Sequence, residues 1–205
     1  MRGATILFVA ATVLFCFQSS ALAQFGVGAA KKILADAGAI VSVDMSDLTI
    51  PLGERPVISV RAVGNMEDSE LIQAALFRKL DSLAVESPRI TDEGVAGICG
   101  LPRLRYVALE SPKVGDPSIK HIAKLPSLEI LSLSKTGVTD AGMKDIVAMP
   151  KLKRLVLNDT ALTDAGLKTL VGAKKLESLV VDRTKVTEAG LKAFREARPE
   201  CKLGE

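Results

Sequence analysis

The side chains that most often carry chemistry are few in this chain of 205 residues. It has a single histidine, His121, three cysteines (Cys16, Cys99 and Cys201) and no tryptophan. These residues are too few for a His- or Cys-rich zinc site. A serine–histidine–acid mechanism would have to use His121 alone, and no nucleophile is placed to make it a catalytic base. We therefore expect no catalytic residues, no metal ligands and no cofactor.

The composition is globular and only weakly basic. Hydrophobic residues make up 48% and charged residues 25%, and the formal net charge is +3. Such a small charge does not indicate nucleic acid or an anionic membrane as a partner. A spaced row of lysines lacks interleaved aromatic or arginine residues, so we interpret it as a solvated face. The row consists of Lys120, Lys144, Lys168 and Lys192.

The segment 1–23 has the plan of a secretory signal peptide. Arg2 forms a short positive region, residues 4–17 form an apolar run, and Ala21-Leu22-Ala23 is an A-x-A cleavage site. The apolar run is shorter than the roughly 20 residues that a membrane-spanning helix needs. We predict cleavage after Ala23 and a secreted or periplasmic protein whose mature chain is not inserted in a membrane.

A period of 24 residues dominates the second half of the chain. Counted from the start of each copy, positions 18 and 20 are apolar and alternate with other residues, which is strand periodicity. Positions 6 and 9 are apolar with a helical step of three. Each unit therefore predicts a short helix, a loop and a short strand, which bury their apolar faces only when units stack. The copies begin at Ile90, Val114, Val138, Leu162 and Val186, with a degenerate copy at Met66.

The pattern L-x-x-L-x-L, together with T-D-A-G-L at the helix start, resembles the leucine-rich repeat family. It is most similar to secreted bacterial proteins of the planctomycete type, with V-T-D-A-G-L units. The resemblance covers residues 66–205. It implies an α/β, right-handed solenoid with a parallel sheet on the concave face and short helices on the convex face. We expect a signal peptide over 1–23, a helix and strand cap over 24–65, and about six units with a C-terminal cap over 66–205.

Recurring small and polar residues have structural interpretations. Thr at position 2 and an acid at position 3 predict a capped helix start rather than a calcium site. Gly at position 5 predicts close contact between the backbones of neighbouring units, since it costs about 1 kcal/mol in a helix. Thr136, Thr160 and Thr184 at position 23 predict a buried hydroxyl ladder, which Pro88 and Pro112 interrupt in the first two copies.

Cys99 and Cys201 lie at positions 10 and 16 of units four repeats apart. With strands about 4.8 Å apart, their separation along the axis is about 19 Å. A disulfide needs Cα atoms within about 7 Å. We therefore expect these two cysteines not to pair within one chain.

Strand positions 17, 19 and 21 point away from the predicted core, onto the concave face. Tyr and Arg, which recur in binding hot spots, lie there beside a polar to acidic column. The alternative is that these residues only satisfy strand propensity. We expect a scaffold that binds a protein or peptide of unknown identity. The alternative is a structural, self-associating envelope or matrix component, and the oligomeric state is open. The candidate residues are Tyr106, Glu110, Ile130, Arg154, Val156, Asn158, Val180 and Asp182.

Overall fold

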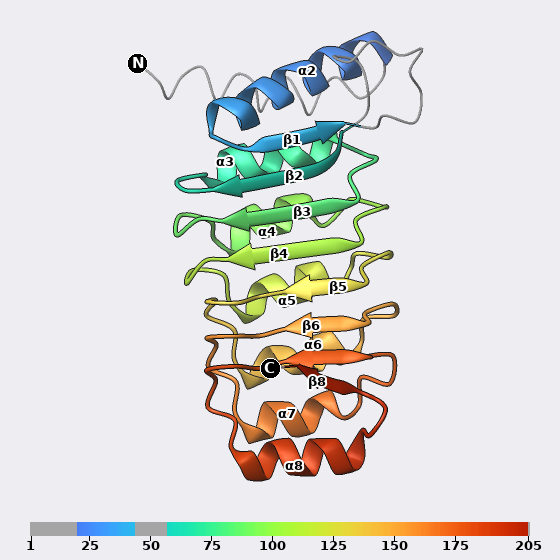
Figure 1. Cartoon of the computed structure of the whole chain (residues 1–205). Coiled ribbons are helices and arrows are strands. Elements are labelled where there is room, and N and C mark those ends of the chain that lie inside the picture. Colours follow the sequence, from blue (N-terminus) through green and yellow to red (C-terminus); the bar gives the residue numbers. More distant parts are fainter. Residues whose placement is uncertain (1–19, 44–56, 205) are drawn as a thin grey trace.

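One sheet of eight strands runs through the chain in sequence order (Figure 1). The computed structural model describes residues 20–43 and 57–204, so most of the predicted signal peptide lies outside the described residues. β1 pairs antiparallel with β2, and every later pair is parallel. The strands are β1 (Ile40–Val43), β2 (Val57–Val63), β3 (Ser82–Glu86), β4 (Tyr106–Glu110), β5 (Ile130–Ser132), β6 (Arg154–Val156), β7 (Ser178–Val180) and β8 (Lys202–Gly204).

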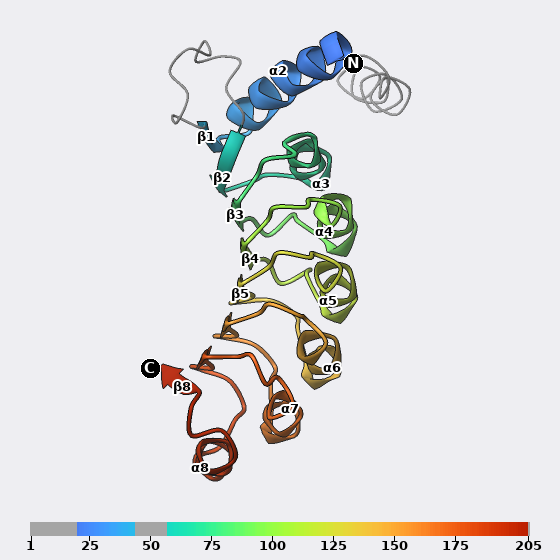
Figure 2. The ribbon, with the colours of Figure 1, turned by 90° about the vertical axis from the view of Figure 1, so that its right-hand side faces the viewer.

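Short helices alternate with the parallel strands. Seen along the strands, the molecule is an arc with the sheet on its inner, concave side and the helices on its outer, convex side (Figure 2). The predicted α/β solenoid is therefore confirmed. The helices are α2 (Ser20–Asp36), α3 (Asp68–Leu71), α4 (Asp92–Ile98), α5 (Asp116–Ile122), α6 (Met143–Val147), α7 (Asp164–Leu170) and α8 (Glu188–Ala197). Two 3-10 turns, η2 (Ile72–Leu76) and η3 (Asp140–Gly142), precede β3 and α6.

The core follows the period of the repeat. The side chains at position 18 lie opposite one another across neighbouring strands, and each is 0% exposed. Alternate side chains of a strand point to opposite faces, so the residues on either side of this row face the concave surface. The buried row consists of Leu83, Val107, Leu131, Leu155 and Leu179.

Aspartates at position 3 join each unit to the next. The Asp140 carboxylate accepts hydrogen bonds from the backbone N–H of Thr163 at 2.8 Å and from its hydroxyl at 2.6 Å. The Thr163 hydroxyl in turn accepts from the N–H of Ala165 and so caps α7. Three further Asp–Thr pairs repeat the link: Asp68–Thr91, Asp116–Thr139 and Asp164–Thr187. The predicted threonine caps are present, and the acids add a contact between units.

The recurring glycine makes room for that carboxylate. A Cβ atom on Gly166 would overlap the Asp140 side chain, and a Cβ on Gly94 or Gly190 would overlap the aspartate of the preceding unit. The close contact predicted at position 5 is therefore with a side chain and not with the neighbouring backbone. In the unit that begins at Val114, Ser118 takes the place of this glycine, and its hydroxyl donates to Asp92 at 2.5 Å.

The hydroxyl ladder differs from the prediction. The Thr136, Thr160 and Thr184 hydroxyls each donate to a carbonyl three residues earlier, so they form local bonds rather than a continuous ladder. In the two Ser-Pro units, the buried hydroxyls of Ser87 and Ser111 donate across the coil to the carbonyls of Met66 and Ile90 at 2.7 Å. In these two units the serine before the proline thus supplies a buried hydroxyl in place of the threonine.

Both ends of the stack are covered. At the N-terminal end, α2 buries Ala30 and Leu34, both 0% exposed. This helix spans the predicted cleavage site after Ala23, and its buried residues lie beyond that site. At the C-terminal end, Arg198 is only 4% exposed and donates to the carbonyls of Ala173 and Leu176 at 2.8 and 2.9 Å. No helix in the described ranges is long and apolar enough to cross a bilayer.

Candidate protein-binding surface

The concave face carries three rows of side chains, one at each outward strand position. The first row, at position 17, sets Tyr106 beside Ile130 and Ile130 beside Arg154 in register across β4, β5 and β6. Tyr106 and Ile130 are half-buried and Arg154 is exposed. Neighbouring strands lie about 4.8 Å apart, so these three side chains form one continuous strip. The 24-residue period therefore predicted correctly which side chains are neighbours in this row.

The second row, at position 19, is small and shallow. It runs from Ala84 through Ala108 and Ser132 to Val156 and Val180. Val156 is half-buried, as a residue on a concave face should be, whereas Val180 is 7% exposed. Val180 was expected to offer contact area, and this expectation is wrong. A Cβ atom placed on Gly204 of β8 would lie 3.0 Å from the Cγ2 atom of Val180. The terminal strand therefore covers the Val180 side chain.

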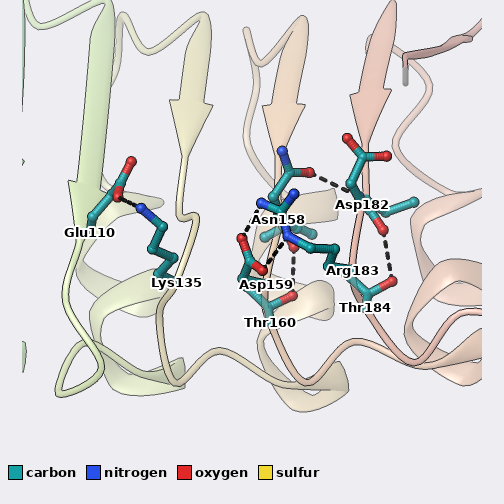
Figure 3. Close-up of polar contacts among 10 residues, drawn as sticks. Glu110, Lys135, Asn158, Asp159, Thr160, Asp182, Arg183 and Thr184 are labelled. Carbon is teal, nitrogen blue, oxygen red and sulfur yellow. Dashed lines mark hydrogen bonds and ion pairs between the residues drawn. The ribbon is translucent and has the colours of Figure 1, made fainter.

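The third row, at position 21, lies where the strands end and is tied into a polar network (Figure 3). Glu110 accepts from the ammonium of Lys135 at 2.8 Å. The side-chain oxygen of Asn158 accepts from the backbone N–H of Asp182 at 2.9 Å. The charge of Glu110 is thus paired, and the Asn158 side chain holds the turn that follows the next strand.

Position 22, next to this row, was missed by sequence reasoning. Lys135, Asp159 and Arg183 adopt φ angles of 54°, 55° and 53°, in the left-handed region that side chains other than Gly, Asn and Asp rarely occupy. Arg183 pairs with Asp159 through two bonds of 2.5 and 2.6 Å. This pairing lowers the pKa of Asp159, and the Glu110 contact raises the pKa of Lys135. Three left-handed turns thus present charged side chains along one border of the concave face.

A second charged column borders the face where the strands begin. Position 16 alternates in sign through Asp81, Arg105, Glu129 and Lys153. Glu129 pairs with Arg105 and with Lys153, both at 3.0 Å. Hydrogen bonds from these two cations lower the pKa of Glu129 to about 2. The alternation of sign from one repeat to the next was the signal that could have predicted this column.

Other reactive side chains of the described residues include the acids at position 3, Cys99 and Cys201. Within the described ranges, no group of three or more His, Cys, Asp or Glu side chains could hold a metal ion. The position 3 aspartates direct their oxygens to the next unit, as above. Cys99 and Cys201 are both free, and burial raises the pKa of the Cys99 thiol to about 12. Such a thiol is protonated and unreactive at neutral pH.

Comparison with known proteins identifies the repeat. A family model described as "Leucine Rich repeat" matches residues 124–147 and 148–171. These two 24-residue segments are therefore similar to leucine-rich repeats. The two matched repeats include β5, β6, α6 and α7 and so lie at the centre of the arc. Leucine-rich repeat domains generally serve as scaffolds for protein interaction.

Comparison with solved structures and with curated proteins gives no functional assignment. A crystal structure of a protein from Bacteroides fragilis is similar at 21% sequence identity and a TM-score of 0.48. The alignment covers 62% of this chain and 41% of the Bacteroides protein. No curated protein matches the sequence significantly.

Proposed function

We propose that this chain is a secreted or periplasmic scaffold, without catalytic activity, that binds a protein or peptide through the concave face of its leucine-rich repeats. The observation that carries the proposal is the strip of Tyr106, Ile130 and Arg154. These side chains lie in register on a rigid sheet and outside the hydrophobic core. Within the described residues, no ion pair holds the Arg154 guanidinium. Tyr and Arg are among the residue types that dominate binding hot spots.

A comparison with the side chains of the convex face also favours the concave face as the binding surface. The helices present exposed lysines such as Lys144 and Lys168. Each long lysine side chain loses up to about 2 kcal/mol of rotamer entropy when it is fixed. The half-buried Tyr106 and Ile130 are already held by the sheet, so binding costs them less entropy. The five strands β3 to β7 give a face about 20–25 Å across, which suits a peptide or one side of a small domain.

The experiment starts with a partner isolated by affinity capture from envelope or secreted fractions. Tyr106→Ala and Arg154→Glu should each weaken binding to that partner by about 1–3 kcal/mol, with the melting temperature unchanged. The matched controls are Lys144→Glu and Lys168→Glu on the convex helices, which should bind normally. If the lysine variants lose binding and the strand variants keep it, the convex face is the binding site and the proposal is wrong.

The proposed location rests on the segment 1–23. Expression of the full chain in a bacterial host should deliver a periplasmic or secreted protein whose N-terminal sequence begins at Gln24. Substituting Ala23 with a bulky residue such as Phe should block processing, because cleavage sites require small side chains. An intact N-terminus in the cytosolic fraction would contradict the location and leave the concave-face proposal standing.

A further inference from the structure

Charge is segregated onto the two long edges of the arc. We define the basic edge as the segments that lead from each helix into the next strand: 75–82, 99–106, 123–130, 147–154, 171–178 and 195–202. These segments contain thirteen Lys and Arg against five Asp and Glu. We define the acidic edge as the segments that lead from each strand into the next helix: 61–70, 85–94, 109–118, 133–142, 157–166 and 181–190. These contain thirteen Asp and Glu against six Lys and Arg.

The two edges lie on opposite sides of the sheet, because all strands from β2 onward point from the basic edge to the acidic edge (Figure 1). Helix dipoles explain part of this polarity, since acids favour helix starts. They do not explain the lysines of the basic edge. α6 ends at Val147 and α7 at Leu170, whereas the lysine pairs lie at 151 and 153 and at 174 and 175. The dipole effect falls off within the last turn.

The basic edge is hollowed where its charge is most concentrated. A groove of about 490 Å³ is lined by four lysines, Lys151, Lys153, Lys174 and Lys175, and by three glutamates, Glu129, Glu177 and Glu200. Lys153 pairs with Glu129, and Lys175 donates to the carbonyl of Pro150 at 2.7 Å. Lys151 and Lys174 are exposed. The groove therefore offers two solvated ammonium groups to an acidic partner.

The complementary surface is on the same chain. The first two segments of the acidic edge, 61–70 and 85–94, hold six acids against two bases. Glu86 and Glu93 of these segments are exposed. The negative charge is densest at the N-terminal end of one edge and the lysine groove lies toward the C-terminal end of the other, so one copy cannot bring them together. Both edges repeat with the strand spacing of about 4.8 Å.

We propose that a second copy of this chain docks side by side, with the N-terminal part of its acidic edge against the lysine groove of the first. The contact joins two different surfaces, so it is heterologous and every added copy leaves one groove and one acidic edge free. Such contacts build open rows unless the rotation closes them. The concave face remains accessible, and this inference is therefore independent of the proposed function.

Sedimentation velocity of the full processed chain tests the proposal. The average mass should rise with protein concentration at about 20 mM salt and fall to that of a monomer at about 0.5 M, because the screening length shrinks from roughly 20 Å to a few ångströms. Lys151→Glu with Lys174→Glu should raise the concentration for half-association at least tenfold. Glu86→Lys with Glu93→Lys should do the same. An equimolar mixture of the two variants should associate again, because each reversed edge then meets its opposite.

The matched control is Lys144→Glu with Lys168→Glu, which changes the net charge equally on the convex face and should leave association unchanged. A monomer at every salt concentration would overturn the proposal, as would association that survives both edge reversals. Failure of the mixture to restore association would also overturn it. If instead the groove lysines are needed to bind polyphosphate while self-association is absent, the groove serves an external polyanion and not a second copy.

Discussion

The carboxylate of Asp140 determines which residue the next unit can hold at position 166. Replacing Gly with Ala inside a helix normally stabilises it by about 1 kcal/mol. Gly166→Ala should instead destabilise the chain by about 1–3 kcal/mol, because the added methyl group overlaps Asp140 and displaces it from Thr163. Gly28→Ala in α2 is the control, since a Cβ there meets nothing within 4 Å. Urea unfolding measures both, and stabilisation by both substitutions would refute the steric role of the carboxylate.

Glu129 gives a pH-dependent prediction. Its folded-state pKa of about 2 lies below that of an unfolded glutamate, about 4.3. A depressed pKa contributes stability that is present above about pH 4.3 and is lost as the pH falls toward 2. The stability difference between wild type and Glu129→Gln should thus be constant at neutral pH and shrink on acidification between these values. Denaturant titrations at several pH values measure this difference, and a difference that grows on acidification would contradict the ion-pair assignment.

At the scale of the repeat element, the hydroxyl that binds each aspartate can come from either of two positions. Most units use Thr at position 2 with Gly at position 5, whereas the unit at Val114 has Gly115 and Ser118. Ser118→Gly should cost about 1–3 kcal/mol, because Asp92 loses a charge-assisted bond. Adding Gly115→Thr should recover most of it, since a Cβ on Gly115 makes only ordinary contacts and lies 4.0 Å from Asp92 Oδ2.

A double-mutant cycle by thermal or urea unfolding measures this coupling. Gly115→Thr with Ser118 retained is the control and should change stability little. If the double variant is no more stable than Ser118→Gly alone, the two positions are not interchangeable donors.

The strand register gives a second prediction at this scale. Leu155 is 0% exposed in the buried row, and Val156, one residue on, faces the concave surface. Leu155→Ala should destabilise the chain by about 2–5 kcal/mol. Val156→Ala should cost well under half as much, because its side chain keeps contact with water. Equal losses in thermal melts would show that the register is shifted by one residue.

The elements were predictable from the sequence because their signals are local and recur in every unit. Strand alternation located Leu155, and the Thr-Asp pairs located the helix starts. The contacts between units were harder to predict from the sequence. Glu129 meets Arg105 and Lys153 only after three units have stacked, and Arg198 binds carbonyls of the preceding unit. The exposure of Val180 was predicted wrongly because β8 covers its side chain. The repeat period alone does not predict where this terminal strand lies.

At the scale of the whole molecule, the arc separates four surfaces with different chemistry: two faces and two edges. The concave face offers Tyr106, Ile130 and Arg154 on a rigid sheet. The convex face offers solvated lysines. The two edges carry opposite charge. A scaffold with this layout can hold a partner on its inner face while its edges remain accessible, and the central claim is that the inner face is the one that binds.

Site-specific photocrosslinking in cells tests that claim most directly, because the partner need not be known beforehand. A photoreactive amino acid at Ile130, in the centre of the concave strip, should give a discrete crosslinked product on irradiation. The same amino acid at Lys168, on the convex face of α7, should give none. A crosslinked product from position 168 and none from position 130 would contradict the concave binding surface.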